Sequence, residues 1–230
     1  MRRYKNARTV MSMVTVLAIL WLVLRRYRGP NYMPGWEEVI KERYGLDKAR
    51  TIIPDVRREL SVLLAETPMP NNQTLRWHLT QNILPGLALY RVLLKEHDGD
   101  RQAAITSFEC AVRAWTISRS RFMLLPLKIL PAPFFWFRLV FPQVMKKYPA
   151  DGWDIALVEN SDERVAFDIT RCYYLNTLTA FKAPELTASF CKGDDVMAEL
   201  YPASIRFERA HTLGRGDQVC DFQYCRQRQT

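Results

Sequence analysis

The sequence lacks the short motifs and most of the histidines on which several common enzyme classes depend. It contains no glycine-rich phosphate loop, no GxSxG nucleophile elbow and no HExxH zinc motif. Only three histidines occur, His78, His97 and His211, so a catalytic Cys–His pair has few candidates. These absences exclude P-loop nucleotide enzymes, α/β-hydrolases and HExxH metalloproteases as expected classes.

Acidic residues are missing from the first 29 positions, which carry most of the excess positive charge. The formal net charge is +9, and the seven basic residues of this stretch leave +2 for the rest of the chain; they are Arg2, Arg3, Lys5, Arg8, Arg25, Arg26 and Arg28. Basic side chains beside an apolar segment face phospholipid headgroups. The charge therefore indicates a membrane flank, and because no nucleic-acid-binding motif is present we expect no nucleic-acid partner.

An uncharged apolar run lies between these basic groups. Residues 10–24 read VMSMVTVLAILWLVL, which as a helix would span about 22 Å of a hydrocarbon core of about 30 Å. A cleaved signal peptide would need a small-x-small cleavage site after the run, but residues 25–28 read RRYR. The sequence predicts a single-pass N-terminal membrane anchor within residues 1–29, followed by one folded domain over residues 30–230.

The five cysteines include no closely spaced CxxC pair, which argues against both a disulfide scaffold and a zinc ribbon. Reduced thiols are the simpler interpretation, and they favour a domain on the cytoplasmic side of the membrane. An exported domain with two disulfides and one free thiol is the alternative.

Helical spacing dominates residues 30–147. We expect three helical stretches, over residues 36–67, 84–97 and 98–120. Pro54 would separate two helices within the first stretch. Asp98 or Asp100 would cap the last one.

The stretch 122–142 (FMLLPLKILPAPFFWFRLVFP) is apolar enough to suggest a second membrane span. Pro126, Pro131 and Pro133 would each disrupt a lipid-exposed helix, so we expect the stretch not to cross the membrane. It is either a buried, irregular part of the core, or an aromatic surface that lies against a bilayer or lines an apolar pocket.

From residue 148 the pattern changes to strands and short helices. The predicted elements are two strands, two helices and two strands, over residues 153–159, 164–170, 172–182, 184–200, 204–209 and 218–224. The fold class is therefore α+β: a helical N-terminal half (30–147), then a ββααββ antiparallel sheet with helices on one face (148–230). The predicted membrane helix precedes both halves.

Three cysteines fall at the edges of predicted elements and are candidates for chemistry. Cys172 follows a strand and opens a helix, where backbone N–H groups and the helix dipole lower a thiol pKa. Cys191 has Asp194 about one turn further on, and Cys220 directly precedes Asp221; such carboxylates can act as bases or metal ligands. Buried, inert thiols are the alternative for each cysteine. A metal site of the three thiols is conceivable, but their spacing does not require one.

An ordered set of residues within 148–224 carries a family resemblance. Its members are Asp168, Cys172, Tyr174, Pro184, Glu185, Leu186, Cys191, Asp194, Phe207, Arg209, Thr212, Gly216, Cys220, Asp221 and Phe222. In this order they resemble the pattern of the L-2-amino-thiazoline-4-carboxylic acid hydrolase family. Residues 83–104 (ILPGLALYRVLLKEHDGDRQAA) are similar to the helical half of that family, with less specificity.

The resemblance implies hydrolysis of a cyclic amidine, in the class of hydrolases that act on carbon–nitrogen bonds other than peptide bonds. Water or an enzyme nucleophile would add to the carbon between nitrogen and sulfur, and the thiazoline ring would open to an N-carbamoyl-cysteine. The true substrate of this chain is left open. The sequence identifies no cofactor, and we predict no metal.

The resemblance also implies roles for particular residues. The catalytic candidates are Cys172, Cys191, Asp194, Cys220 and Asp221, and the substrate-binding candidates are Tyr174, Arg209 and Thr212. Cys172 or Cys191 would be the nucleophile, and Asp194 or Asp221 the acid–base group. Arg209 would bind the substrate carboxylate through paired hydrogen bonds.

A non-catalytic small-molecule-binding or accessory subunit at the membrane is the competing hypothesis. Such a domain would be similar to the vinyl-reductase-like binding domains, with the aromatic stretch as its pocket and the cysteines as structural residues. In both hypotheses the partners are the membrane, through residues 10–24, and a small-molecule ligand or substrate. A protein partner is left open.

Overall fold

The structure is a computed structural model that describes residues 35–227. The membrane anchor predicted over residues 10–24 lies outside the described residues. Within residues 35–227, no helix is both long enough and apolar enough to cross a membrane.

The first part of the described chain is helical, as predicted. Its elements are α2 (Trp36–Glu66), α3 (Gln73–His78), the π-helix η1 (Leu79–Ile83), α4 (Leu84–Glu96) and α5 (Arg101–Met123). The Asn72 side chain caps α3 by accepting hydrogen bonds from the backbone N–H groups of Thr74 and Leu75. Of the two caps predicted for α5, the structure uses Asp100, whose carboxylate accepts from the Ala103 N–H at 3.1 Å.

The break in α2 lies at Gly45, so the prediction that Pro54 separates two helices is wrong. Gly45 has a φ of +78°, which glycine adopts readily because it has no Cβ. Pro54 lies inside the helix without ending it. A proline removes only one helical hydrogen bond, and the buried side chains of Ile52 and Val56 on either side keep this part of α2 packed on the core.

Helix α4 is the centre of the helical core. Its residues Leu84 to Tyr90 are all buried, and it packs between α2 and α5. Gly86 is required there, because a Cβ at this position would collide with the rings of Phe190 and Phe108. The Phe190 ring of α9 thus reaches α4 at Gly86, while α9 itself packs along α5.

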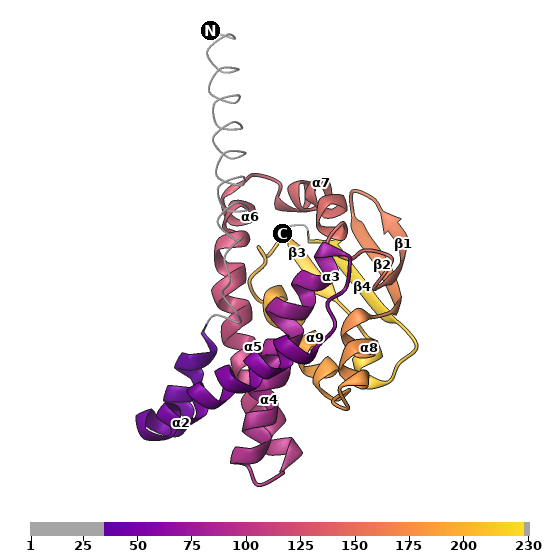
Figure 1. Cartoon of the computed structure of the whole chain (residues 1–230). Helices are drawn as coiled ribbons and strands as arrows, with labels where there is room; N and C mark the ends of the chain where they lie inside the picture. The colour runs from indigo at the N-terminus through magenta and orange to yellow at the C-terminus, as the bar shows by residue number, and fades with distance from the viewer. Residues whose placement is uncertain (1–34, 228–230) are drawn as a thin grey trace.

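The second part of the described chain forms one antiparallel sheet with two helices inserted, which confirms the predicted ββααββ order. Its elements are β1 (Asp154–Asn160), β2 (Arg164–Arg171), α8 (Tyr173–Ala180), α9 (Leu186–Ala198), β3 (Ile205–Glu208), η2 (Leu213–Arg215) and β4 (Cys220–Arg226). The strand order across the sheet is β1-β2-β4-β3. Figure 1 shows α9 between α5 and the sheet, so this helix joins the two parts.

The apolar stretch 122–142 is helical and half-buried, and not an irregular part of the core. It contains the end of α5, then α6 (Leu125–Ile129) and most of α7 (Pro133–Met145). Prolines at the first turns of α6 and α7 start these helices, where a missing N–H removes no helical hydrogen bond. Phe134 and Phe141 of α7 are buried in the core of the sheet, whereas Phe135 and Leu139 are exposed.

Candidate active site

Cys172 lies between β2 and α8, at the position predicted from the sequence. It has an extended backbone, and its carbonyl accepts the Asn176 N–H at 3.1 Å in the first turn of α8. Burial raises the pKa of the Cys172 thiol, and the backbone amides of Leu175 and Tyr174 offset only part of this rise. The expected lowering of this pKa is therefore wrong, because desolvation outweighs the effect of the helix N-terminus.

Helix α9 and strand β4 bring three further candidates to the same place as Cys172. Burial is the main cause of the raised pKa at Cys172, Cys191 and Cys220, and the negative charge of Asp194 raises the pKa of each thiol further. Three of the predicted catalytic residues, all thiols, thus lie within electrostatic reach of a fourth, the Asp194 carboxyl group. We call Cys172, Cys191, Asp194 and Cys220 the Asp194 cluster.

Asp194 is the group in this cluster that titrates nearest to neutral pH. Burial raises the pKa of its carboxyl group to about 6, although the positive charge and hydrogen bond of Arg209 lower it, and the neighbouring Asp195 adds to the rise. Its side chain remains 36% exposed, so solvent reaches it. A carboxyl group with these properties can give or take a proton close to pH 6.

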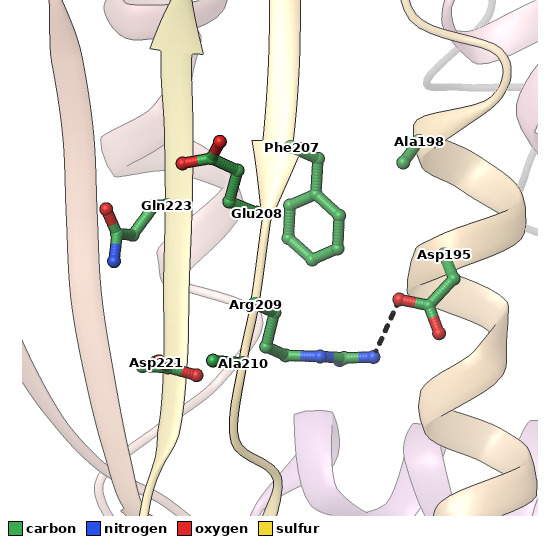
Figure 2. Close-up of a pocket in the computed structure, with 8 residues that line it drawn as sticks. All are labelled: Asp195, Ala198, Phe207, Glu208, Arg209, Ala210, Asp221 and Gln223. Atoms are coloured by element: carbon green, nitrogen blue, oxygen red, sulfur yellow. Dashed lines mark hydrogen bonds and ion pairs between the residues drawn. The ribbon is translucent and has the colours of Figure 1, made fainter.

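Arg209 is almost fully buried and fastens the end of β3 to α9. Its guanidinium donates to the Asp194 carboxylate at 2.8 Å, to Asp195 at 2.9 Å and to the Cys191 carbonyl at 3.0 Å. It also lies over the ring of Phe222, 5.1 Å from its centre. Figure 2 shows the side chain directed at Asp195. These contacts make Arg209 a positioning residue for α9, and its predicted contact with a substrate carboxylate stays a prediction.

Asp221, the fifth catalytic candidate, interacts on the other side of β4. Strand alternation buries Cys220 and turns Asp221 away. The Asp221 carboxylate accepts the backbone N–H of His211 at 2.6 Å and pairs with its ring nitrogen at 3.0 Å. Burial raises the pKa of Asp221, but the two hydrogen bonds from His211 lower it overall. With Glu208 and Gln223, Asp221 lines an open depression of about 640 Å³ (Figure 2).

Tyr174, predicted to bind substrate, is fully engaged with the helical part of the chain. Burial lowers the pKa of His78 to about 4, so its ring is neutral at pH 7. His78 Nε2 lies 2.8 Å from the Lys147 carbonyl and must donate to it, which leaves Nδ1 as an acceptor. The Tyr174 hydroxyl donates to that Nδ1 at 3.1 Å and accepts from the Asn82 amide at 2.9 Å.

Thr212, the remaining substrate-binding candidate, is buried beside η2. Its backbone N–H donates to the Asp217 carboxylate at 2.7 Å. Its hydroxyl oxygen is buried without a hydrogen-bond partner among residues 35–227. A role of this hydroxyl toward a ligand stays a prediction.

Three tyrosines near Asp194 were not singled out from the sequence. Burial raises the pKa of Tyr148 to about 12 and also raises the pKa of Tyr201 and Tyr224, and the Asp194 charge adds to the rise at each. These tyrosines come from three separate segments of the chain. Isolated tyrosines form no motif, so only the folded arrangement identifies them.

Thiols, carboxylates and imidazoles are also the side chains that coordinate metals. In the part of the chain that the structure describes, no group of three or more His, Cys, Asp or Glu side chains is arranged to hold a metal ion. The histidines have other contacts: His78 with Tyr174, His97 with Tyr44, and His211 with Asp221.

The fold and the site together define an α+β domain with a four-stranded antiparallel sheet and an interior carboxyl–thiol cluster. The sequence model of the L-2-amino-thiazoline-4-carboxylic acid hydrolase family matches residues 129–224. This match confirms the resemblance seen in the sequence over these residues. The match begins at the last residue of α6 and includes α7, α8, α9, every residue of the Asp194 cluster and all of the sheet except the last two residues of β4.

Other comparisons contribute less. No curated protein matches the chain. A crystal structure of an Fe(II) unliganded H-NOX protein from K. algicida is similar over 86% of this chain and 96% of that chain, with 11% sequence identity and a TM-score of 0.38. At this TM-score, no statement about fold or function rests on the similarity.

Proposed function

We propose that the Asp194 cluster is the catalytic site of a hydrolase that opens a small cyclic amidine, similar to L-2-amino-thiazoline-4-carboxylate. The main supporting observation is that Asp194, whose carboxyl group has a pKa of about 6, lies among three thiols whose pKa values are raised. Asp194 is therefore the group able to exchange protons near neutral pH, while the thiols stay protonated. The family match over residues 129–224 supports the reaction class.

Access to the cluster is consistent with a small substrate. Asp194 and Tyr148 both have pKa values raised by desolvation, yet 36% of the Asp194 side chain and 37% of Tyr148 remain exposed. Side chains that are surrounded by protein and still reach solvent are expected where they line a recess. We infer that a ligand approaches Asp194 from the side of Tyr148.

Water is the nucleophile that these pKa values favour. Asp194, as the carboxylate, would accept a proton from water while the water oxygen bonds to the carbon between nitrogen and sulfur. The ring carbon–sulfur bond then breaks, and the proton passes from Asp194 to the departing sulfur. The second proton of the water moves from oxygen to the ring nitrogen, so that the carbon becomes the carbonyl of the carbamoyl group. The product is an N-carbamoyl-cysteine with a free thiol. Attack by Cys172 or Cys191 would first require removal of a proton from a thiol that burial keeps protonated.

The test is turnover of L-2-amino-thiazoline-4-carboxylate by the full chain, followed as release of free thiol. Asp194→Asn should lower turnover by about 100-fold or more, since general acid–base catalysis contributes about 10²–10⁴-fold. Asp195→Asn is the matched control, because Asp195 also pairs with Arg209; its loss should lower the pKa of Asp194 but leaves the Asp194 carboxyl group in place. Equal losses in the two variants would assign the effect to Arg209, and full activity of Asp194→Asn would overturn the proposal.

The thiols are tested separately. If water attacks, Cys172→Ser and Cys191→Ser should each keep turnover within about tenfold of the unchanged chain. If a cysteine attacks, the variant that lacks this cysteine should lose turnover. An intermediate attached to either cysteine, detected by mass spectrometry, would replace the water route with a covalent one.

A non-catalytic binding domain is the second candidate function. The observation in its favour is the raised pKa of all three thiols, since protonated, buried thiols are typical of structural cysteines. Binding of the same amidine measured by calorimetry, without turnover, would support this candidate.

We also propose that residues 10–24 anchor the chain in a membrane, with the domain on the cytoplasmic side. The support is the uncharged apolar run with basic flanks and the absence of CxxC pairs. Resistance of the full chain to alkaline extraction from membranes, with digestion of residues 35–227 by protease added to the cytoplasmic side, is the expected result.

A further inference from the structure

The end of α5 together with α6 and α7 exposes an unusual number of large apolar side chains. They are Phe122, Met123, Leu125, Ile129, Phe135, Leu139, Val140 and Val144, each between 36% and 63% exposed. We call these eight residues the apolar face. Figure 1 shows α6 and α7 next to each other at the end of the molecule opposite the turn between α4 and α5. Scattered apolar residues are normal on a protein surface, but a contiguous set marks an interaction site.

Helix α7 is apolar on both of its sides. Phe134 and Phe141 pack into the core of the sheet, and Phe135, Leu139 and Val140 point to solvent on the other side. A helix that packs on one side only usually carries polar residues on the other. The outward side of α7 therefore has the apolar composition that is typical of a surface buried in an interface.

The segment that carries the apolar face contributes basic residues but no acidic ones. Residues 111–150 contain no Asp or Glu, and their basic residues are Arg113, Arg119, Arg121, Lys128, Arg138, Lys146 and Lys147. Arg113 and Arg138 pair with Glu199 and Asp162. Arg121, Lys128 and Lys146 are exposed among or beside the apolar residues. Exposed apolar side chains with basic residues around them match the interface of a bilayer that contains anionic lipids.

The described chain begins beside the middle of α5. Gly35 lies against Ala114 of α5, and the helix continues from there for about 14 Å to Met123. Residues 30–34 can span about 17 Å when extended. The segment that precedes the domain in the sequence can therefore reach the plane of the apolar face.

We propose that the apolar face is a docking surface for an anionic lipid bilayer. The apolar residues of α6 and α7 enter the region between headgroups and acyl chains, and Arg121, Lys128 and Lys146 contact lipid phosphates and carboxylates. The surface orients the domain on the membrane and does not depend on the proposed hydrolase activity.

The test places a tryptophan on the apolar face of the full chain. Leu139→Trp and the matched control Leu46→Trp, at a 66% exposed position of α2, are each reconstituted in vesicles of phosphatidylcholine and phosphatidylserine with brominated acyl chains. Fluorescence is compared with that of the unchanged chain. The tryptophan introduced on the apolar face should be quenched, and the one introduced on α2 should not. Lys128→Gln and Lys146→Gln should each lower the docked-to-undocked ratio about fivefold, the effect of one basic residue near an anionic surface.

Three results would overturn the proposal. Equal quenching in Leu139→Trp and Leu46→Trp would mean that the face does not enter the bilayer. If quenching of the Leu139→Trp variant is the same in vesicles without phosphatidylserine, docking does not require anionic lipid. A blue shift of the Leu139→Trp emission in vesicle-free detergent solution that grows with protein concentration would assign the face to a second copy of the chain.

Discussion

Arg209 donates a 2.8 Å hydrogen bond to Asp194, and the pKa of that carboxyl group is nevertheless raised to about 6. A charged hydrogen bond alone would lower the pKa of an aspartate. Desolvation inside the fold is the larger effect, so Asp194 is held in place by Arg209 and still able to take up a proton. This combination distinguishes Asp194 from Asp221, whose pKa is lowered by His211.

Removing the Arg209 charge should destabilise the domain. Arg209→Gln leaves Asp194 and Asp195 without their shared cation, and we expect a loss of about 2–3 kcal/mol, below the range for fully buried pairs because both carboxylates are partly exposed. Arg206→Gln, in strand β3 just before Arg209, is the control, since the pair of Arg206 with Glu208 is exposed and should contribute less than about 1 kcal/mol. Urea unfolding measures both, and equal losses would contradict the assignment.

Stability should respond to pH through Asp194 in a defined direction. Its pKa is 3.8 in the unfolded reference and about 6 in the fold, so the folded state binds more protons between these values. The stabilising contribution of Asp194 to the free energy of unfolding is then complete below pH 3.8 and is lost as the pH rises through 6. The free energy of unfolding of Asp194→Asn, minus that of the unchanged chain, should therefore increase from pH 4 to pH 7. His78 titrates in both proteins and cancels in the difference, so a flat or falling difference would contradict the raised pKa.

The three thiols of the cluster should react slowly at neutral pH. Burial raises the pKa of Cys172, Cys191 and Cys220, which leaves little thiolate. At pH 7.5 we expect alkylation by iodoacetamide at least about tenfold slower than for free cysteine, and faster reaction as the pH rises. Peptide mass spectrometry identifies the modified residue, with the urea-unfolded chain as the control. Rapid modification of Cys172 would contradict this expectation and support the lowered thiol pKa predicted from its place at a helix N-terminus.

Tyr174 should be structurally important because it connects the two parts of the fold. Tyr174→Phe leaves His78 Nδ1 and the Asn82 amide without this buried partner, at a cost of about 1–3 kcal/mol. Tyr173→Phe, at the adjacent and half-buried position, should cost clearly less. Thermal and urea unfolding provide the comparison, and similar effects at the two positions would show that the buried hydroxyl network contributes little.

The sequence predicted the order of elements well and helix interruptions less well. Alternating residues in 153–159 and 164–170 identified the β1–β2 hairpin, since that pattern is local. Proline is a local helix breaker too, but at Pro54 the packing of Ile52 and Val56 overrode it, and the break occurred at Gly45. Proline is intrinsically the stronger helix breaker, so here tertiary packing outweighed the local preference.

The sequence by itself determined the α+β class, the position of Cys172 between β2 and α8, and the ordered residues that identify the family region. Each of these depends on spacing along the chain. Only the tertiary structure decided that Asp194, and not Asp221, meets the three thiols, that the pKa of Cys172 rises, and that Arg209 is occupied by α9. The reason is physical: a pKa and a hydrogen-bond partner depend on desolvation and on charges brought together from distant segments, and spacing in the sequence does not encode them.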